Sequence, residues 1–391
     1  MKRLAIVSTH PIQYYAPVFA LLAKRVDLKV FYTWGEKSTQ AKYDPGFGKV
    51  VKWDLPLLEG YDYQFLENSS ANPGSHHYKG IQNPFIIEQI TRFEPHAILV
   101  FGWAYSSHLK VLRHFCGKVE VWFRGDSNLI DGQKGLKAVL REIFLRFVYS
   151  KIDKAFFVGS ANKEYFLRYG IKEQQLIFAP HAIDNHRFEI GRDKEVYVLK
   201  EKMGIKDDEV VILFAGKLEP KKDPELLLQA FMLLNRPNTH LLFVGNGILE
   251  KKLKKISDEW CTRNNNSRIS FLDFQNQQMM PVVYQVSDLF CLPSKGPGET
   301  WGLAVNEAMA SGKAVLVSSK VGCAMDLVHK ENGAVFKSGD LMDLKDKLDT
   351  LCRSKSNLLK MGMSSRVLVQ SWSFERQVEV FEKNLVIYGG Q

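Results

Sequence analysis

Short apolar runs alternate with amphipathic helical stretches along the chain, and this alternation constrains the fold more than any other feature of the sequence. Buried strands that alternate with helices form βαβ units around a mainly parallel sheet. The segment Trp34–Ser75, rich in Gly, Asn and Pro, departs from the pattern and predicts an excursion with one or two strands. In the first half, the predicted strands are Leu4–Ser8, Leu28–Tyr32, Ala97–Phe101, Val119–Phe123, Ala155–Val158 and Leu176–Ala179.

The same pattern begins again after residue 190. The predicted strands there are Val210–Phe214, Leu241–Val244, Ile269–Leu272, Leu289–Leu292 and Ala314–Val317. A chain of 391 residues has room for two domains. We therefore predict an α/β fold with Rossmann-like, doubly wound domains over residues 1–188 and 189–372. Loops at the carboxyl ends of parallel strands bind ligands in such folds, and two domains that face each other would place both sets of loops around one cleft.

The charge of the chain is uneven. Lys and Arg exceed Asp and Glu by seven within residues 1–190 but only by three within residues 191–391. A basic first half favours contact with an anionic partner such as phospholipid or phosphate. The sequence has neither zinc-finger spacing nor an aromatic single-strand-binding pattern, which argues against nucleic acid as a partner.

No apolar run reaches the ~18 residues that a membrane-spanning helix needs. The five cysteines include no C-x-x-C pair. This argues against a disulfide framework or a zinc site and favours a reducing compartment. We therefore expect a cytoplasmic protein, either free or peripheral on the inner face of the membrane.

The most informative stretch runs from Pro293 to Gly312, where a glycine-rich loop follows a predicted strand and leads into a helix that begins near Gly302. The unpaired N–H groups of a helix N-terminus suit a phosphate. Glu299 precedes this helix and Glu307 lies within it, so the two carboxylates can reach different parts of one ligand. Their spacing alone is more often that of solvated or capping carboxylates.

Two further predicted strand ends carry candidate phosphate-binding groups. After the strand that ends at Phe214, Gly216 permits close backbone approach, and Lys217 and Lys222 can bind a diphosphate as point charges. The turn Gly245-Asn246-Gly247 follows the next strand. Each segment alone is also compatible with an ordinary βα turn.

In combination, these segments resemble the C-terminal domain of glycosyltransferase family 4, a family of retaining enzymes with the two-Rossmann GT-B architecture. Glu299 and Glu307 match its Glu-x7-Glu motif. The resemblance extends over residues 178–385, and its further segments are Gly216-Lys217-Leu-x-Pro-x-Lys222, Val244-Gly245-Asn246-Gly247, Pro180–Asp184 and the closing Trp372–Leu385. The last of these implies a helix within residues 373–391 that returns to the first domain.

The resemblance implies a nucleotide-sugar site in the second domain. Lys217 and Lys222 would bind the donor diphosphate and stabilise charge on the leaving nucleotide. Glu299 would hold hydroxyl groups of the donor sugar, and Glu307 would accept hydrogen bonds from the ribose. The other donor-binding positions would be Gly216, Gly245, Asn246, Gly302 and Leu303. No Asp-x-Asp motif stands at a predicted strand end, so we expect an enzyme that needs no metal ion and no other cofactor.

The first domain would then bind the acceptor, a glycan or a lipid-linked molecule. The candidate residues at its predicted strand ends are His10, Gln13, Trp103, Arg124 and Asp126. His10 contacts a ligand or caps the following helix. Trp103 stacks on a sugar or belongs to the core. Asp126 takes the acceptor proton or pairs with Arg124, and the residues alone leave these alternatives open.

Residues Lys134–Ile152 predict a basic amphipathic helix. We expect its apolar stripe to pack against the sheet, with Leu145 and Tyr149 off the stripe. The alternative, a helix that lies on an anionic membrane, stays open. The stripe consists of Leu136, Val139, Leu140, Ile143, Phe144, Phe147 and Val148, and the basic residues around it are Lys134, Lys137, Arg141, Arg146 and Lys151.

Two other functions fit the same fold. One is a nucleotide-sugar epimerase or hydrolase, which product analysis without an acceptor would distinguish. The other is a non-catalytic protein that binds a nucleotide-sugar or a glycan. The presence of both lysines and both glutamates of the donor segments argues against loss of catalysis.

Overall fold

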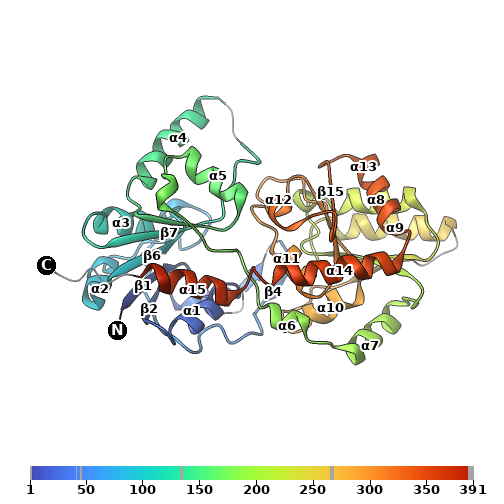
Figure 1. The fold of residues 1–391 in the computed structure, drawn as a ribbon, viewed down its shortest axis with the longest axis horizontal. Coiled ribbons are helices and arrows are strands. Elements are labelled where there is room, and N and C mark those ends of the chain that lie inside the picture. Colours follow the sequence, from blue (N-terminus) through green and yellow to red (C-terminus); the bar gives the residue numbers. More distant parts are fainter. Residues whose placement is uncertain (1, 41, 45, 133–134, 265–267, 386–391) are drawn as a thin grey trace. The chain divides into compact units, whose positions relative to one another are not determined.

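A computed structural model describes residues 2–40, 42–44, 46–132, 135–264 and 268–385 of the chain. It divides into two compact units, which we call the first and second domains (Figure 1). The first domain comprises residues 1–40, 55–181 and 373–391, and the second comprises residues 41–54 and 182–372. The division thus falls at His181–Ala182, whereas we predicted it at residue 188. Residues 41–54, which we assigned to the first domain, group with the second.

The first domain is built on a seven-stranded sheet with the order β5-β2-β1-β6-β7-β8-β9. All neighbouring strands pair in parallel. Leu4, Ala5 and Ile6 of an interior strand are fully buried, as expected for a parallel sheet that is covered on both faces. The strands are β1 (Arg3–Ser8), β2 (Asp27–Tyr32), β5 (Asp62–Phe65), β6 (Ala97–Phe101), β7 (Glu120–Arg124), β8 (Lys154–Phe157) and β9 (Leu176–Phe178).

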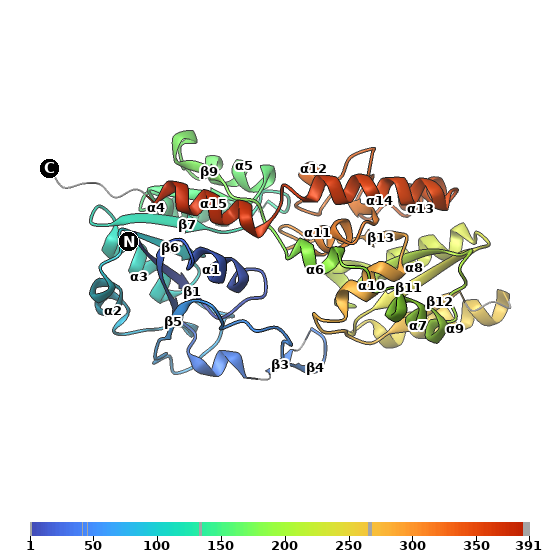
Figure 2. The ribbon, with the colours of Figure 1, turned by 60° about the horizontal axis from the view of Figure 1, so that its bottom comes forward.

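The described part of the first domain contains six α-helices. They are α1 (Ala16–Leu22), α2 (Ile86–Phe93), α3 (Ser106–Phe115), α4 (Leu136–Tyr149), α5 (Ser160–Arg168) and α15 (Phe374–Asn384). The 3-10 helices η1 (Glu36–Thr39), η2 (Tyr78–Gly80) and η3 (Glu173–Gln175) lie in its connections. The last helix, α15, packs beside the first helix, α1 (Figure 2). An ion pair of 2.8 Å between Arg25 and Glu382 joins the two ends of the domain.

The second domain holds a six-stranded sheet with the order β12-β11-β10-β13-β14-β15. All of its strand pairs are parallel. From β10 the chain adds β11 and β12 on one side of the sheet and then β13, β14 and β15 on the other side. The strand order therefore reverses between β10 and β13, which makes this position the switch point of the sheet. The strands are β10 (Val210–Ala215), β11 (Thr239–Val244), β12 (Ile269–Leu272), β13 (Leu289–Leu292), β14 (Ala314–Ser318) and β15 (Gly333–Phe336).

Helices cover both faces of the second sheet (Figure 2). They are α6 (Asn185–Glu189), α7 (Asp193–Met203), α8 (Pro224–Leu234), α9 (Glu250–Asn264), α10 (Met280–Val286), α11 (Leu303–Ala310), α12 (Ala324–Leu327), α13 (Leu341–Leu351) and α14 (Lys355–Val369), with the 3-10 helix η4 (Pro220–Lys222). An antiparallel pair, β3 (Lys42–Asp44) and β4 (Lys49–Val51), completes this domain. Lys49 forms an ion pair of 2.7 Å with Asp273 after β12, which ties the pair to the second sheet.

The predicted fold is confirmed: the chain contains two Rossmann-like α/β domains in series. Each predicted strand is present within two residues of its predicted ends. The described part of the excursion over residues 34–75 holds three strands, β3, β4 and β5, where we expected one or two. We also did not predict β15, whose short sequence Gly-Ala-Val-Phe begins with a glycine. This glycine lies so close to β14 that a Cβ there would stand 1.9 Å from the carbonyl oxygen of Val315.

The expected packing of the helix over residues 134–152 is wrong. The side chains of α4 that pack inward are Leu145, Val148 and Tyr149, and two of these lay off the predicted stripe. Ring contacts of 5.6 Å join Tyr149 to Phe123 and to Phe166. The helix is apolar on two sides, and the core takes the side that we did not expect. Lys134 lies outside the described residues.

Candidate active site

The loops that follow β10 and β13 leave the second sheet at the same edge and next to each other, because the strand order reverses there. Two contacts fasten these loops together. The backbone N–H of Lys295 donates to the carbonyl oxygen of Lys221 over 2.9 Å, and the Lys295 ammonium pairs with Asp223 at 3.0 Å. The two predicted phosphate-binding segments therefore form one site.

Lys222 and Glu299 meet directly in this site. The Nζ of Lys222 contacts Oε2 of Glu299, and the Ser294 hydroxyl donates to the same oxygen over 2.7 Å. The side chains of Lys222 and Glu299 are only 21% and 10% exposed. A lysine and a carboxylate from opposite sides of the switch point are thus held together with little solvent around them.

The helix α11 begins immediately beyond this pair. Its N-cap is Gly302, with φ of 98°. A Cβ at Gly302 would stand 2.8 Å from Cγ1 of Val321, so both the backbone conformation and the space favour glycine. Because Leu303 is the first helical residue, the free N–H groups and the positive end of the helix dipole lie next to Glu299 in the chain.

Glu307 lies one turn further along α11 and is buried. The hydroxyl of Tyr284, from α10, donates to its Oε2 over 2.8 Å. The orientation of this carboxylate is therefore fixed by a neighbouring helix. Its predicted contact with a ribose stays a prediction.

Lys217 contacts an aspartate that we did not predict. Its Nζ lies 2.8 Å and 3.0 Å from the two carboxylate oxygens of Asp44 in β3, and 4.9 Å from the centroid of the Phe47 ring. Partial burial acts to raise the pKa of the Asp44 carboxyl, but the contacts with Lys217 and with the N–H groups of Gly46 and Phe47 outweigh it and lower the pKa. The segment 41–54 thus brings a carboxylate to a predicted phosphate ligand.

The turn after β11 is packed against the loop after β10. A Cβ at Gly245, whose φ is 132°, would stand 2.1 Å from the carbonyl oxygen of Gly216. Asn246 is buried; its amide donates to Glu250 over 2.9 Å and to Asp273 over 3.0 Å. This side chain holds the loops together, and the donor contact that we predicted for it stays a prediction.

In the first domain, two candidates lie in the loop between β1 and α1. The Nδ1 of His10 is 2.9 Å from the Thr9 hydroxyl, and its ring meets the Trp34 ring edge-on at 5.4 Å. Gln13 is partly exposed in the turn before α1. Both positions follow a strand end at the switch point between β1 and β6.

Arg124 is buried at the end of β7. Its guanidinium donates to the carbonyl oxygens of Ala179 and Pro180 over 2.8 Å and 3.1 Å. Burial lowers the pKa of Arg124 to about 10. Its side chain therefore holds the backbone that leads to the second domain, and its predicted contact with a ligand stays a prediction.

Asp126 is partly exposed in the loop that follows β7. Burial raises the pKa of the nearby Tyr15, and the negative charge of Asp126 raises it further. His181 is also buried here, and burial together with the nearby Arg124 charge lowers its pKa. The ring of Tyr15 stacks on that of His181 at 6.1 Å, so one ionisable cluster joins β7, α1 and the end of the first domain.

A buried histidine in α3 was missed. His108 Nε2 lies 2.9 Å from the Thr33 hydroxyl, and its Nδ1 lies 3.1 Å and 3.0 Å from the carbonyl oxygens of Phe101 and Gly102. Burial lowers its pKa to about 4. Its contacts hold the loop that carries Trp103, and a lone histidine in a helical pattern gives no sequence signal for such a role.

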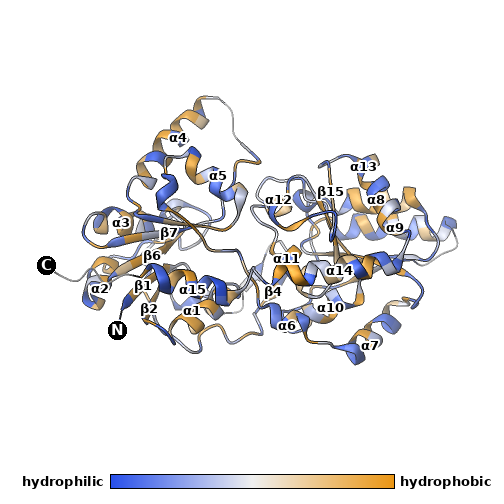
Figure 3. Cartoon of the chain, viewed as in Figure 1, coloured by the Kyte–Doolittle hydropathy of each residue, from blue (hydrophilic) through white to orange (hydrophobic). Residues whose placement is uncertain are grey.

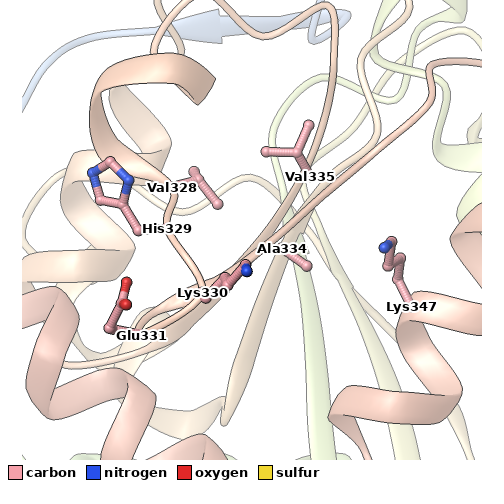
Figure 4. A pocket seen from close by; sticks show the side chains of 8 residues that line it. Val328, His329, Lys330, Glu331, Ala334, Val335 and Lys347 are labelled. Atoms are coloured by element: carbon pink, nitrogen blue, oxygen red, sulfur yellow. The ribbon is translucent and has the colours of Figure 1, made fainter.

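A pocket of 440 Å³ lies elsewhere in the second domain (Figure 4). The residues that line it are Val328, His329, Lys330, Glu331, Gly333, Ala334, Val335 and Lys347. Its described lining thus shares no residue with the predicted donor site. Across the described ranges, no three His, Cys, Asp or Glu side chains are grouped as a metal ion would require, and no helix has the length and apolar character to span a bilayer.

Parts of the sequence are similar to known glycosyltransferases. Residues 198–366 match the family model of the glycosyl transferases group 1, and they contain all the predicted donor-site residues. An uncharacterised glycosyltransferase of Methanocaldococcus jannaschii is 32% identical over 156 residues, which are 39% of this chain and 38% of that protein. A D-inositol 3-phosphate glycosyltransferase of Mycolicibacterium smegmatis is 25% identical over 217 residues, 52% of this chain and 48% of that protein.

The chain therefore spans about half the length, or less, of these curated relatives. A solved structure is similar over both domains. HepE of Anabaena, in complex with UDP and glucose, has a TM-score of 0.70 over 98% of this chain and 99% of its own, at 17% sequence identity. The fold of this chain is accordingly the GT-B fold, and its second domain resembles the glycosyl transferases of group 1.

Proposed function

We propose that the protein is a retaining glycosyltransferase of family 4, which moves a sugar from a nucleotide-sugar to a hydroxyl group of a glycan or lipid-linked acceptor and uses no metal ion. The observation that carries the proposal is the contact between Lys222 and Glu299 beside the N-terminus of α11. A phosphate needs the ammonium and the helix terminus, and a sugar needs the carboxylate. The match of residues 198–366 to group 1 supports the same function.

The leaving group explains the two lysines. As the bond between the anomeric carbon and the donor phosphate breaks, negative charge grows on the nucleoside diphosphate, and a bond forms between the anomeric carbon and the acceptor oxygen. Lys217, Lys222 and the first N–H groups of α11 stabilise this charge, a type of stabilisation that is usually large in enzymes. The proton of the acceptor hydroxyl passes to the leaving phosphate.

The two glutamates divide the rest of the donor between them. Glu299 accepts hydrogen bonds from hydroxyl groups of the donor sugar and orients its anomeric carbon. Glu307, fixed by Tyr284 at 2.8 Å, accepts from the ribose hydroxyls. HepE has been crystallised with UDP and with UDP-glucose, which supports a UDP-sugar as the first donor to test.

Calorimetric titration with UDP, GDP and ADP in the presence of EDTA tests the donor site. We expect one nucleotide to bind and the variant Lys222→Met to weaken that binding about 10-fold to 100-fold, since a charge-assisted contact with phosphate contributes about 1.5–3 kcal/mol. Lys252→Met is the matched control, because this lysine pairs with Glu225 at 2.7 Å on the surface of the same domain. A folded protein that binds none of the three would contradict the proposal.

The preferred nucleotide then defines the donor for a product assay. NMR of the reaction with the corresponding nucleotide-sugar and a panel of glycosyl acceptors should show an anomeric configuration equal to that of the donor. Conversion without any acceptor would instead indicate an epimerase or a hydrolase.

A further inference from the structure

We propose that α4 carries a docking surface for a membrane that contains anionic lipid. Six apolar side chains lie exposed along one side of this helix, and we call them the α4 face. They are Leu136, Val139, Leu140, Ile143, Phe144 and Phe147, and their exposed fractions lie between 40% and 75%. Figure 3 shows apolar residues along α4 in the first domain. Scattered apolar residues on a surface need no explanation, but a contiguous set of this size does.

The α4 face is separate from the surface that anchors the helix. Leu145, Val148 and Tyr149 are at most 2% exposed and hold α4 against the core. Because the helix repeats every 3.6 residues, these three positions lie opposite the α4 face. The exposed side chains therefore take no part in the core of the domain. The helix that carries them is anchored by its opposite side.

The charges around the α4 face fit a negatively charged lipid surface. Lys137 and Arg141 are exposed along one edge, and Arg146 lies along the other. The Nζ of Lys151 lies 5.1 Å from the centroid of the Phe147 ring, just beyond the end of the helix. Side chains of this length can place their charge at lipid headgroups while the apolar face enters the acyl boundary.

One acidic residue lies on the same helix. Glu142 pairs with Arg146 at 3.0 Å and with Arg168 of α5 at 2.6 Å. Its single charge is thus shared between two arginines, and the surroundings of the α4 face remain cationic. The cationic surroundings of the α4 face favour an anionic bilayer over a neutral apolar partner. They agree with the excess of seven basic residues within residues 1–190.

The α4 face also adjoins a strand end of the first sheet. The rings of Phe144 and Trp103 meet at 5.5 Å, and Trp103 lies in the loop between β6 and α3. A protein docked through the α4 face would hold this loop at the lipid headgroups. This extension rests on the proposed function: the acceptor would then be a lipid-linked molecule that approaches the first domain from the bilayer.

Sedimentation of the full chain with vesicles tests the docking surface. The probes are vesicles of phosphatidylcholine with or without about one third phosphatidylglycerol. We expect binding to the anionic vesicles, at least 10-fold weaker binding by the double variant Ile143→Ser/Phe147→Ser, and weaker binding as salt rises, because the Debye length shortens to about 3 Å at 1 M salt. Replacing exposed side chains should leave the core intact, which circular dichroism checks.

The control variant is Leu359→Ser/Val367→Ser on α14 of the second domain. These side chains are 60% and 71% exposed, so the same loss of exposed apolar surface occurs on another helix, and binding should not change. Equal binding by the α4 variant, equal binding to neutral vesicles, or no binding by the wild type would overturn the proposal. A wild-type dimer without lipid that the α4 variant converts to a monomer would also overturn it, since a second copy would then cover the face. Calorimetry with the nucleotide is an independent measurement, so failure of lipid binding and failure of the donor site remain distinguishable.

Discussion

The two domains share one architecture but differ in what stands at the ends of their strands. In the second domain, Lys222 and Glu299 come from neighbouring loops and contact each other with part of their surface still open. In the first domain, Arg124 and His108 are buried, and their hydrogen bonds go to groups of the same domain, namely backbone carbonyl oxygens and the Thr33 hydroxyl. A ligand can compete for the partly exposed ion pair, whereas the buried groups already have hydrogen-bond partners within their own domain. Two sheets of the same type can thus leave ionic groups open to a ligand in one domain and use such groups for hydrogen bonds within the fold in the other.

The largest effect should come from the second domain's carboxylate. We expect Glu299→Gln to lower the rate of sugar transfer about 1000-fold, because an amide cannot replace a charged acceptor that orients the donor in the transition state. Steady-state kinetics with saturating donor measures this loss. Glu225→Gln, which removes a carboxylate from a surface ion pair of the same domain, should leave the rate within twofold of the wild type. A comparable loss in both variants would mean that Glu299 has no special part in the reaction.

The next largest effect should be a loss of stability when the packing between the second domain's loops is disturbed. Gly245→Ala should destabilise this domain by about 3 kcal/mol, since the new Cβ meets the carbonyl oxygen of Gly216 at 2.1 Å in a backbone region that few other residues adopt. Urea unfolding measures the loss. Gly204→Ala is the matched control: φ is 66° and no atom lies within 4 Å of the added carbon, so about 1 kcal/mol is expected. Equal losses would show that the contact with Gly216 does not matter.

The buried His108 should make the stability of the first domain depend on pH. Burial lowers the pKa of His108 to about 4 in the folded state, against an ordinary value of 6.5. Between these values the unfolded chain binds more protons, so stability falls as the pH falls below 6.5, by about 2 kcal/mol at pH 5. The fluorescence of Trp122, buried in the same domain, follows the transition.

The variant His108→Gln should remove the contribution of His108 and leave that of the buried His181, whose pKa is also lowered, and His329→Gln, an exposed position of the second domain, should not change the slope. If both variants keep the slope of the wild type, His108 is not the group responsible.

The smallest effect should come from Asp44. A donor phosphate and the Asp44 carboxylate compete for the same ammonium group of Lys217, at 2.8 Å in the structure. We therefore expect Asp44→Asn to tighten nucleotide binding about twofold to fivefold, the scale of one partly exposed ion pair. Asp62→Asn, at an exposed pair in the first domain, controls for the loss of charge. Weaker binding by Asp44→Asn would show instead that Asp44 holds Lys217 in place for the ligand.

The sequence predicted most of the fold, and it placed the two loops that meet in the second domain, for the same physical reason. Strand ends, glycine turns and helix starts are local, so the positions of Lys222 and Glu299 followed from the elements on either side of them. The contact between Asp44 and Lys217 joins residues 173 positions apart, and no local pattern reports it.

The helix α4 shows a second limit of sequence patterns. Periodicity identified its apolar residues correctly, but Leu145 and Ile143 both read as apolar, and only tertiary packing decides that the first is buried and the second exposed. The same holds for Arg124 and His108, whose partners lie on other segments: backbone carbonyl oxygens for both, and the Thr33 hydroxyl for His108.

The helix α15 gives the first domain an unusual dependence on the order of synthesis. Its Phe381 ring packs on Phe156 of the first sheet at 4.9 Å, and the Lys154 ammonium donates to the carbonyl oxygen of Asn384 over 3.0 Å. During translation, the first domain therefore cannot complete its fold until α15 is made, which happens after the whole second domain has been translated. Until then, the surface of α1 and β8 that receives α15 is uncovered, and a chaperone that shields apolar surface during translation would find its substrate there.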